Sequence, residues 1–103
     1  MESSDFNTWP LHDAPLDKIT IDWENKFCQF DLDIFIQSGS DAIPHKIIWS
    51  DLIEINIPCR YPWGKSIFIN SNRKKGLNEY IIEMQSGDEI KIIAEKIELF
   101  EVK

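Results

Sequence analysis

The fold of this chain is indicated most clearly by residues 79–94, which read Glu79-Tyr80-Ile81-Ile82-Glu83-Met84-Gln85-Ser86-Gly87-Asp88-Glu89-Ile90-Lys91-Ile92-Ile93-Ala94. Apolar residues recur at every second position on both sides of Ser-Gly-Asp, which is typical of two antiparallel strands joined by a tight turn. The positions predicted to face the core are Tyr80, Ile82, Met84, Ile90, Ile92 and Ala94. Two further isoleucines, Ile81 and Ile93, fall on the outward face, so we expect that face to be partly covered.

Similar alternation predicts further strands over residues 17–23, 27–36, 46–57 and 96–103, the last as a separate strand or a strand extension. In the first of these, Ile19, Ile21 and Trp23 share the predicted inward face. We expect a turn at residues 24–26, a loop at 38–41 and a bulge near Ser50, where the apolar phase slips. Residues 65–70 fit either a short strand or one helical turn, and residues 71–76 read as a basic, polar loop.

These elements predict an all-β fold with room for one short helix. Short connections favour a mostly antiparallel meander, and a hairpin with two apolar faces favours a small sandwich or an open barrel. A chain of 103 residues fits a single domain spanning residues 1–103. We expect residues 1–8 to be a flexible or loosely docked tail, within an N-terminal segment of residues 1–10 that docks on the core through Phe6 and Trp9.

The chain carries a formal net charge of −7, from 18 acidic and 11 basic residues. Nucleic-acid-binding domains normally present a basic face, so we expect no nucleic-acid partner. Two cysteines, Cys28 and Cys59, are too few for a disulfide framework. The polar N-terminus does not resemble a secretory signal, and no apolar run is long enough to cross a bilayer. We therefore expect a cytoplasmic protein without a membrane partner.

Motifs for catalysis or cofactor binding are incomplete. Gly64-Lys65-Ser66 is similar to the end of a phosphate-binding loop, but the glycine required five positions earlier is replaced by Cys59. His12 and His45 lack partners at metal-ligand spacing, and His12 next to Asp13 is interpreted as a local hydrogen-bonding pair. We predict no catalytic residue, no cofactor and no metal site, and hence a protein that is not an enzyme.

Three segments resemble small bacterial immunity proteins of polymorphic toxin and contact-dependent inhibition systems. The first is Trp9-Pro10-Leu11-His12-Asp13-Ala14-x-Leu16 followed by an Ile-x-Ile-Asp-Trp strand. The others are Pro62-Trp63-Gly64-x-Ser66 and the late hairpin around residues 83–88. The resemblance implies a cytosolic protein that binds one cognate toxin domain and blocks it, without catalytic residues of its own.

An acidic surface with a few aromatic anchors suits capture of a basic toxin domain such as a nuclease. The residues predicted to bind this partner are Asp31, Asp33, Tyr61, Trp63, Glu79 and Glu83. The alternative is a small β-rich domain that binds a ligand or carbohydrate, with stacking surfaces at Trp9, Trp49, Tyr61 and Trp63. The sequence leaves the oligomeric state and the strand order open.

Overall fold

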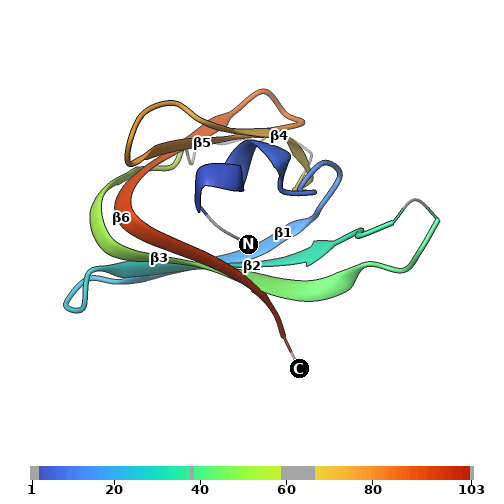
Figure 1. The fold of residues 1–103 in the computed structure, drawn as a ribbon, viewed down its shortest axis with the longest axis horizontal. Helices are drawn as coiled ribbons and strands as arrows, with labels where there is room; N and C mark the ends of the chain where they lie inside the picture. Colours follow the sequence, from blue (N-terminus) through green and yellow to red (C-terminus); the bar gives the residue numbers. More distant parts are fainter. Residues whose placement is uncertain (1–2, 38, 59–66, 103) are drawn as a thin grey trace.

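The computed structural model describes residues 3–37, 39–58 and 67–102 of the chain (Figure 1). It contains one short 3-10 helix, η1 (Ser3–Thr8), and six strands: β1 (Leu16–Asp22), β2 (Phe27–Ile34), β3 (Ile43–Asn56), β4 (Ile69–Lys74), β5 (Glu79–Met84) and β6 (Glu89–Glu101). Among these residues, no helix combines the length and apolar character needed to cross a bilayer.

The six strands form one sheet in the order β1-β2-β3-β6-β5-β4, and every pair in it is antiparallel. Two three-stranded meanders, β1-β2-β3 and β4-β5-β6, are joined through β3 and β6. Strand β4 follows the inner strand β3 in sequence but lies at the edge of the sheet opposite β1. The predicted all-β, mostly antiparallel fold is confirmed. The sheet is not closed into a barrel, because its edge strands meet, within the described residues, at one isolated bridge between Pro15 and Phe68.

The long strands β3 and β6 bend together and take part in both halves of the sheet (Figure 1). Their register shifts between Leu52 and Glu54, and Asp51 has a φ of 52°, which places a bulge close to the predicted Ser50. The bend folds the sheet into two facing walls. The lower wall holds β1, β2 and the adjoining halves of β3 and β6, and the upper wall holds β4, β5 and the other halves (Figure 1).

The core lies between these two walls. All six inward positions predicted for the 79–94 hairpin are buried, and the turn between its strands contains Gly87 at a φ of 97°. An edge-to-face pair links the walls, with the ring centroids of Trp49 and Tyr80 5.3 Å apart. A tilted pair, Phe30 and Trp49 with centroids 5.5 Å apart, packs within the lower wall. The hairpin is therefore one half of a shared core.

The N-terminal segment fills the opening between the walls (Figure 1). Phe6 in η1 is 0% exposed, and its ring centroid lies 5.1 Å from that of Tyr80. Asn72 Nδ2 of β4 donates a hydrogen bond to the Phe6 carbonyl oxygen over 2.6 Å. The flexible or loosely docked tail expected for residues 1–8 is thus not seen over residues 3–8, because Phe6 completes the core and polar side chains hold the backbone around it.

Two local expectations were also wrong. Trp23 does not face the core: β1 ends at Asp22, and Trp23 is 80% exposed in the following turn. Residues 71–74 are not a loop but most of strand β4, since they pair with β5 on one side and are hydrogen-bonded by the N-terminal segment on the other. Residues 96–101 extend strand β6, which is one of the two outcomes expected.

Candidate functional site

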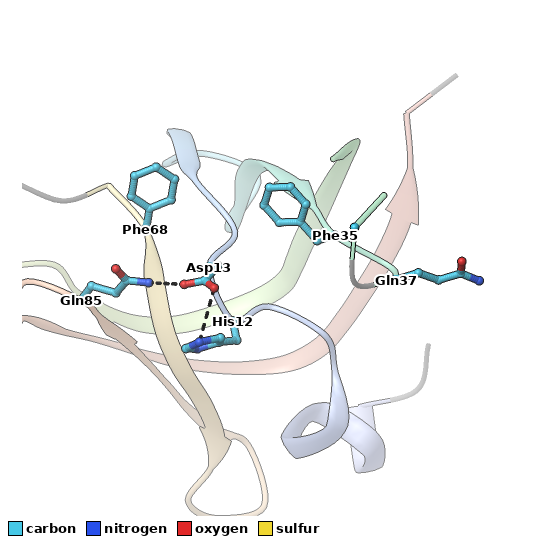
Figure 2. A pocket seen from close by; sticks show the side chains of 7 residues that line it. His12, Asp13, Phe35, Gln37, Phe68 and Gln85 are labelled. Carbon is cyan, nitrogen blue, oxygen red and sulfur yellow. Dashed lines mark hydrogen bonds and ion pairs between the residues drawn. The ribbon is translucent and has the colours of Figure 1, made fainter. Parts of the chain in front are cut away.

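A pocket opens where the two edges of the sheet meet. Leu16 N donates to Ile67 O over 2.8 Å, and Ile69 N donates to Ala14 O over 2.9 Å, on either side of the Pro15–Phe68 bridge. These bonds fix the segment before β1 against the beginning of β4. The pocket has a volume of about 540 Å³ and is lined by His12, Asp13, Phe35, Gln37, Gly39, Phe68 and Gln85 (Figure 2).

Asp13 lies between the two phenylalanine rings of the pocket (Figure 2). Its Oδ1 accepts a hydrogen bond from Gln85 Nε2 over 2.6 Å, and its Oδ2 lies 3.5 Å from His12 Nε2. The Asp13 backbone has a φ of 66°, a left-handed conformation that Asp and Asn tolerate better than most residues. His12 and Asp13 were predicted to form a local hydrogen-bonding pair. The structure places the two side chains in contact at 3.5 Å and adds Gln85, which donates a hydrogen bond to Asp13.

The second feature is a set of three carboxylates, Asp17, Asp31 and Asp33, on the outer face of β1 and β2, which we call the acidic face. Asp17 is the extra residue of a bulge between Leu16 and Lys18. Burial raises the pKa of Asp17 above its ordinary value, and the charge of Asp33, a hydrogen bond with Asp33 and the charge of Asp31 raise it further. Within the described part of the chain, none of the three carboxylates forms an ion pair.

The outer face continues across β3 and β6, where it carries Lys46 and the exposed ring of Phe100. Asp31 is in register with Lys46, which is in register with Phe100. The Lys46 ammonium lies 5.1 Å from the centroid of the Phe100 ring, and 36% of Phe100 is exposed. An exposed aromatic ring therefore lies two strands away from the predicted partner-binding residue Asp31.

The predicted residues Glu79 and Glu83 occupy the outer face of the upper wall. Glu79 Oε1 lies 3.4 Å from Lys91 Nζ and 3.8 Å from Lys75 Nζ, and Glu83 Oε1 accepts a 2.6 Å hydrogen bond from Asn70 Nδ2. These two carboxylates already have partners within the chain. Since the two walls face one core, their outer faces point in opposite directions, and the structure does not bring Glu79 and Glu83 together with Asp31 and Asp33 (Figure 1).

The outward isoleucines of the hairpin are covered, as expected. Ile81 is 5% exposed, and it lies in register between Arg73 and Lys91 on the neighbouring strands. Those two side chains form ion pairs with Glu89 at 3.0 Å and with Glu79 at 3.4 Å. Long charged side chains of the same sheet therefore flank this face.

Two of the four aromatic residues predicted as stacking surfaces, Trp9 and Trp49, are buried and offer no exposed ring. Trp9 and Trp49 are 3% and 0% exposed, because both belong to the aromatic core. Tyr61 and Trp63, the predicted aromatic anchors, lie outside the described residues. Sequence reasoning missed the pocket residues Phe35, Phe68 and Gln85. The position of Phe35 was an available signal, since a large ring stands there on the polar face of an alternating strand.

The described residues contain no group of three or more His, Cys, Asp and Glu side chains placed to hold a metal ion. Cys28 points into the core, and burial raises the pKa of its thiol to about 12. The thiolate that nucleophilic chemistry requires is therefore disfavoured at Cys28 at neutral pH.

No family model and no curated protein matches this chain. Its fold is similar to that in a crystal structure of an uncharacterized protein from Neisseria gonorrhoeae, with a TM-score of 0.60 over 88% of this chain and 93% of that chain. The two sequences are 18% identical, so the likeness is one of fold alone.

Proposed function

We propose that this chain is an immunity-type binding protein that captures and blocks a basic toxin domain through the outer face of its lower wall. The observation that carries the proposal is the acidic face, where Asp17, Asp31 and Asp33 stand together without an ion pair among the described residues. In this proposal the chain acts in the cytoplasm of the producing cell, by binding alone and without a reaction of its own.

The electrostatics of the acidic face support a cationic partner. Partial burial and two neighbouring negative charges disfavour the carboxylate of the largely exposed Asp17. A lysine or arginine of a partner placed over these carboxylates would favour their ionised forms. The net charge of −7 would in addition attract a basic domain from a distance and speed its association.

The surroundings of the acidic face suit a protein surface as the ligand. Interfaces combine apolar anchors with charged rims, and Phe100 offers an exposed ring next to Lys46 and two strands away from Asp31. Glu79 is a weaker candidate than Asp33, because binding a partner through it would compete with its ion pairs to Lys91 and Lys75. Glu83 and Asp31 each accept one side-chain hydrogen bond, from Asn70 and from Gln29, so we rank Asp31 above Glu83 only for its place beside Asp17 and Asp33. The proposal therefore narrows the predicted interface to the β1–β2 side of the molecule.

The test begins with the neighbouring gene, which we expect to encode a large toxin directly upstream. Association of this protein with the C-terminal toxin domain is measured by stopped-flow fluorescence at low and high salt. The double reversal Asp31→Lys/Asp33→Lys should slow association by about tenfold at low salt, and the difference should shrink at high salt.

The double reversal Glu79→Lys/Glu83→Lys is the matched control, since it changes the net charge equally on the opposite wall. It should slow association about twofold or less, provided that thermal unfolding shows it to be folded. Equal slowing by both double reversals would reject the acidic face as the interface. Salt-independent binding of sugars, with no binding of the toxin domain, would instead favour the carbohydrate-binding alternative.

A further inference from the structure

We propose that the pocket at the junction of β1 and β4 binds a guanidinium group, and that the natural source of this group is an arginine of the protein partner. The guanidinium site rests on the aromatic rings and the acceptors that line the pocket. Its assignment to a partner's arginine rests on the function proposed above.

Two aromatic rings flank the pocket. Phe35, which follows β2, and Phe68, which precedes β4, lie on either side of Asp13 (Figure 2). The faces of aromatic rings attract cations, and the planar guanidinium group also stacks on them. A cation in the pocket would lie near both rings and the Asp13 carboxylate, because all three line it.

Two exposed side chains of the pocket, His12 and Asp13, present acceptors next to each other when the His12 ring is neutral. His12 Nδ1 lies 2.7 Å from the Asn70 carbonyl oxygen, which can only accept, so Nδ1 is assigned the proton. In the neutral ring, Nε2 then carries a lone pair, and it lies 3.5 Å from Asp13 Oδ2. Water satisfies both exposed acceptors in the free protein, and a ligand that contacts both atoms must donate a hydrogen bond to each of them.

A guanidinium group satisfies this requirement because it presents several N–H donors in one plane. One N–H can reach the Asp13 carboxylate and another the His12 Nε2, while the rings contact the flat face. An anion would meet the Asp13 charge on a chain of net charge −7. A neutral hydroxylated ligand would gain less from the rings and from the carboxylate.

The pocket adjoins the acidic face, which links it to the proposed partner. Asp33 N donates to Pro15 O over 3.3 Å, and Pro15 is bridged to Phe68. Phe35 stands two residues after Asp33, on the same face of the chain as the outward residues of β2. A basic protein docked on Asp31 and Asp33 could therefore place one arginine in the pocket.

The experiment is an NMR titration of the full chain with ethylguanidinium, and with N-ethylurea as its uncharged isostere. We expect ethylguanidinium to shift the signals of His12, Phe35 and Gln85 with a dissociation constant in the millimolar range, about what so small a ligand can reach. N-Ethylurea should bind at least about fivefold more weakly. Equal binding of the two compounds, or shifts elsewhere in the chain, would overturn the site.

Two variants test the assigned contacts. Asp13→Asn keeps a side chain that accepts from Gln85 and tolerates the left-handed backbone, so it removes chiefly the charge. It should weaken ethylguanidinium binding about fivefold to tenfold, and Phe35→Leu about threefold. Glu98→Gln removes the same charge from an exposed position of β6 outside the pocket and should change binding less than twofold. If Glu98→Gln weakens binding as much as Asp13→Asn, the effect is one of net charge and the site is rejected.

Comparing ligands separates the two sources of a guanidinium group. A basic peptide with one arginine should bind more tightly than free arginine, and replacing that arginine by lysine should weaken it. Tighter binding of free arginine would support the guanidinium site and overturn its assignment to a protein. Toxin capture without ethylguanidinium binding rejects the pocket alone, whereas ethylguanidinium binding without toxin capture rejects the proposed function alone.

Discussion

The outer faces of the two walls carry carboxylates in opposite electrostatic situations. On the upper wall, Glu79 lies between Lys91 and Lys75, and Glu83 is bound by Asn70. On the lower wall, the acidic face groups carboxylates that repel one another. Acidic residues on outer strand faces therefore differ in their electrostatic surroundings. Glu79 forms ion pairs with Lys91 and Lys75, whereas Asp31 forms none among the described residues, although Lys18 and Lys46 are in register with it on the neighbouring strands.

Removing Phe6 should have the largest effect, because both walls pack on this side chain. Phe6→Ala is expected to lower the free energy of unfolding by about 3–5 kcal/mol in urea denaturation, through lost apolar burial and an uncollapsed cavity. Phe100→Ala, on the partly exposed outer face, should cost less than about 1 kcal/mol. Hydrogen exchange should show both walls losing protection in Phe6→Ala, and loss in one wall alone would show that they unfold separately.

Neutralising one carboxylate on each wall should change stability in opposite directions. Glu79→Gln weakens two ion pairs and should lower the free energy of unfolding by about 0.5 kcal/mol at pH 7. Asp33→Asn relieves repulsion with Asp17 and should raise it by up to about 0.5 kcal/mol. Urea denaturation in low salt measures both changes. A loss for Asp33→Asn as large as that for Glu79→Gln would contradict the contrast between the walls.

The smallest expected effect is a difference in pH dependence between two aspartates of β1. The pKa of Asp17 is raised, chiefly by burial, so its contribution to stability is present below its ordinary value of 3.8 and is lost as pH rises through the raised pKa. The pKa of Asp22 is lowered, chiefly by a hydrogen bond from the Asn25 side chain. Its contribution is present above 3.8 and is lost as pH falls through the lowered pKa.

Urea denaturation of Asp17→Asn and Asp22→Asn between about pH 3 and pH 6 checks these signs. The stability of Asp17→Asn relative to the unmodified protein should increase with pH, by less than about 0.5 kcal/mol after solvent screening. The relative stability of Asp22→Asn should decrease with pH. Parallel trends in both variants would show that the two carboxylates do not differ as described.

Much of the fold was predictable because strand alternation is local. The buried positions of the 79–94 hairpin, the alternation of β2 and the bulge near Ser50 all follow from the side-chain period of a strand. Strand β4 was not predictable in the same way. Its polar residues are stabilised by the N-terminal segment, for example through Asn72 and Phe6, which are 66 positions apart.

In the candidate sites, too, local features were predictable from the sequence and long-range contacts were not. Asp31 and Asp33 were predictable as a polar strand face, but Asp17 joins them through a bulge that the alternation does not reveal. The proximity of His12 and Asp13 was predictable from their adjacency. Their association with Gln85 and two phenylalanine rings was not, since it depends on how the sheet edges meet.

The sequence by itself determined that most of the chain forms antiparallel strands with apolar residues at alternate positions, because alternation is a property of neighbouring residues. The tertiary structure alone decided that β3 and β6 fold the sheet over η1, and that Pro15 meets Phe68 at its edges. Those contacts join residues far apart in sequence, and their energies come from burying a shared core. No local sequence pattern therefore predicts the bend of the sheet or the contact between its edges.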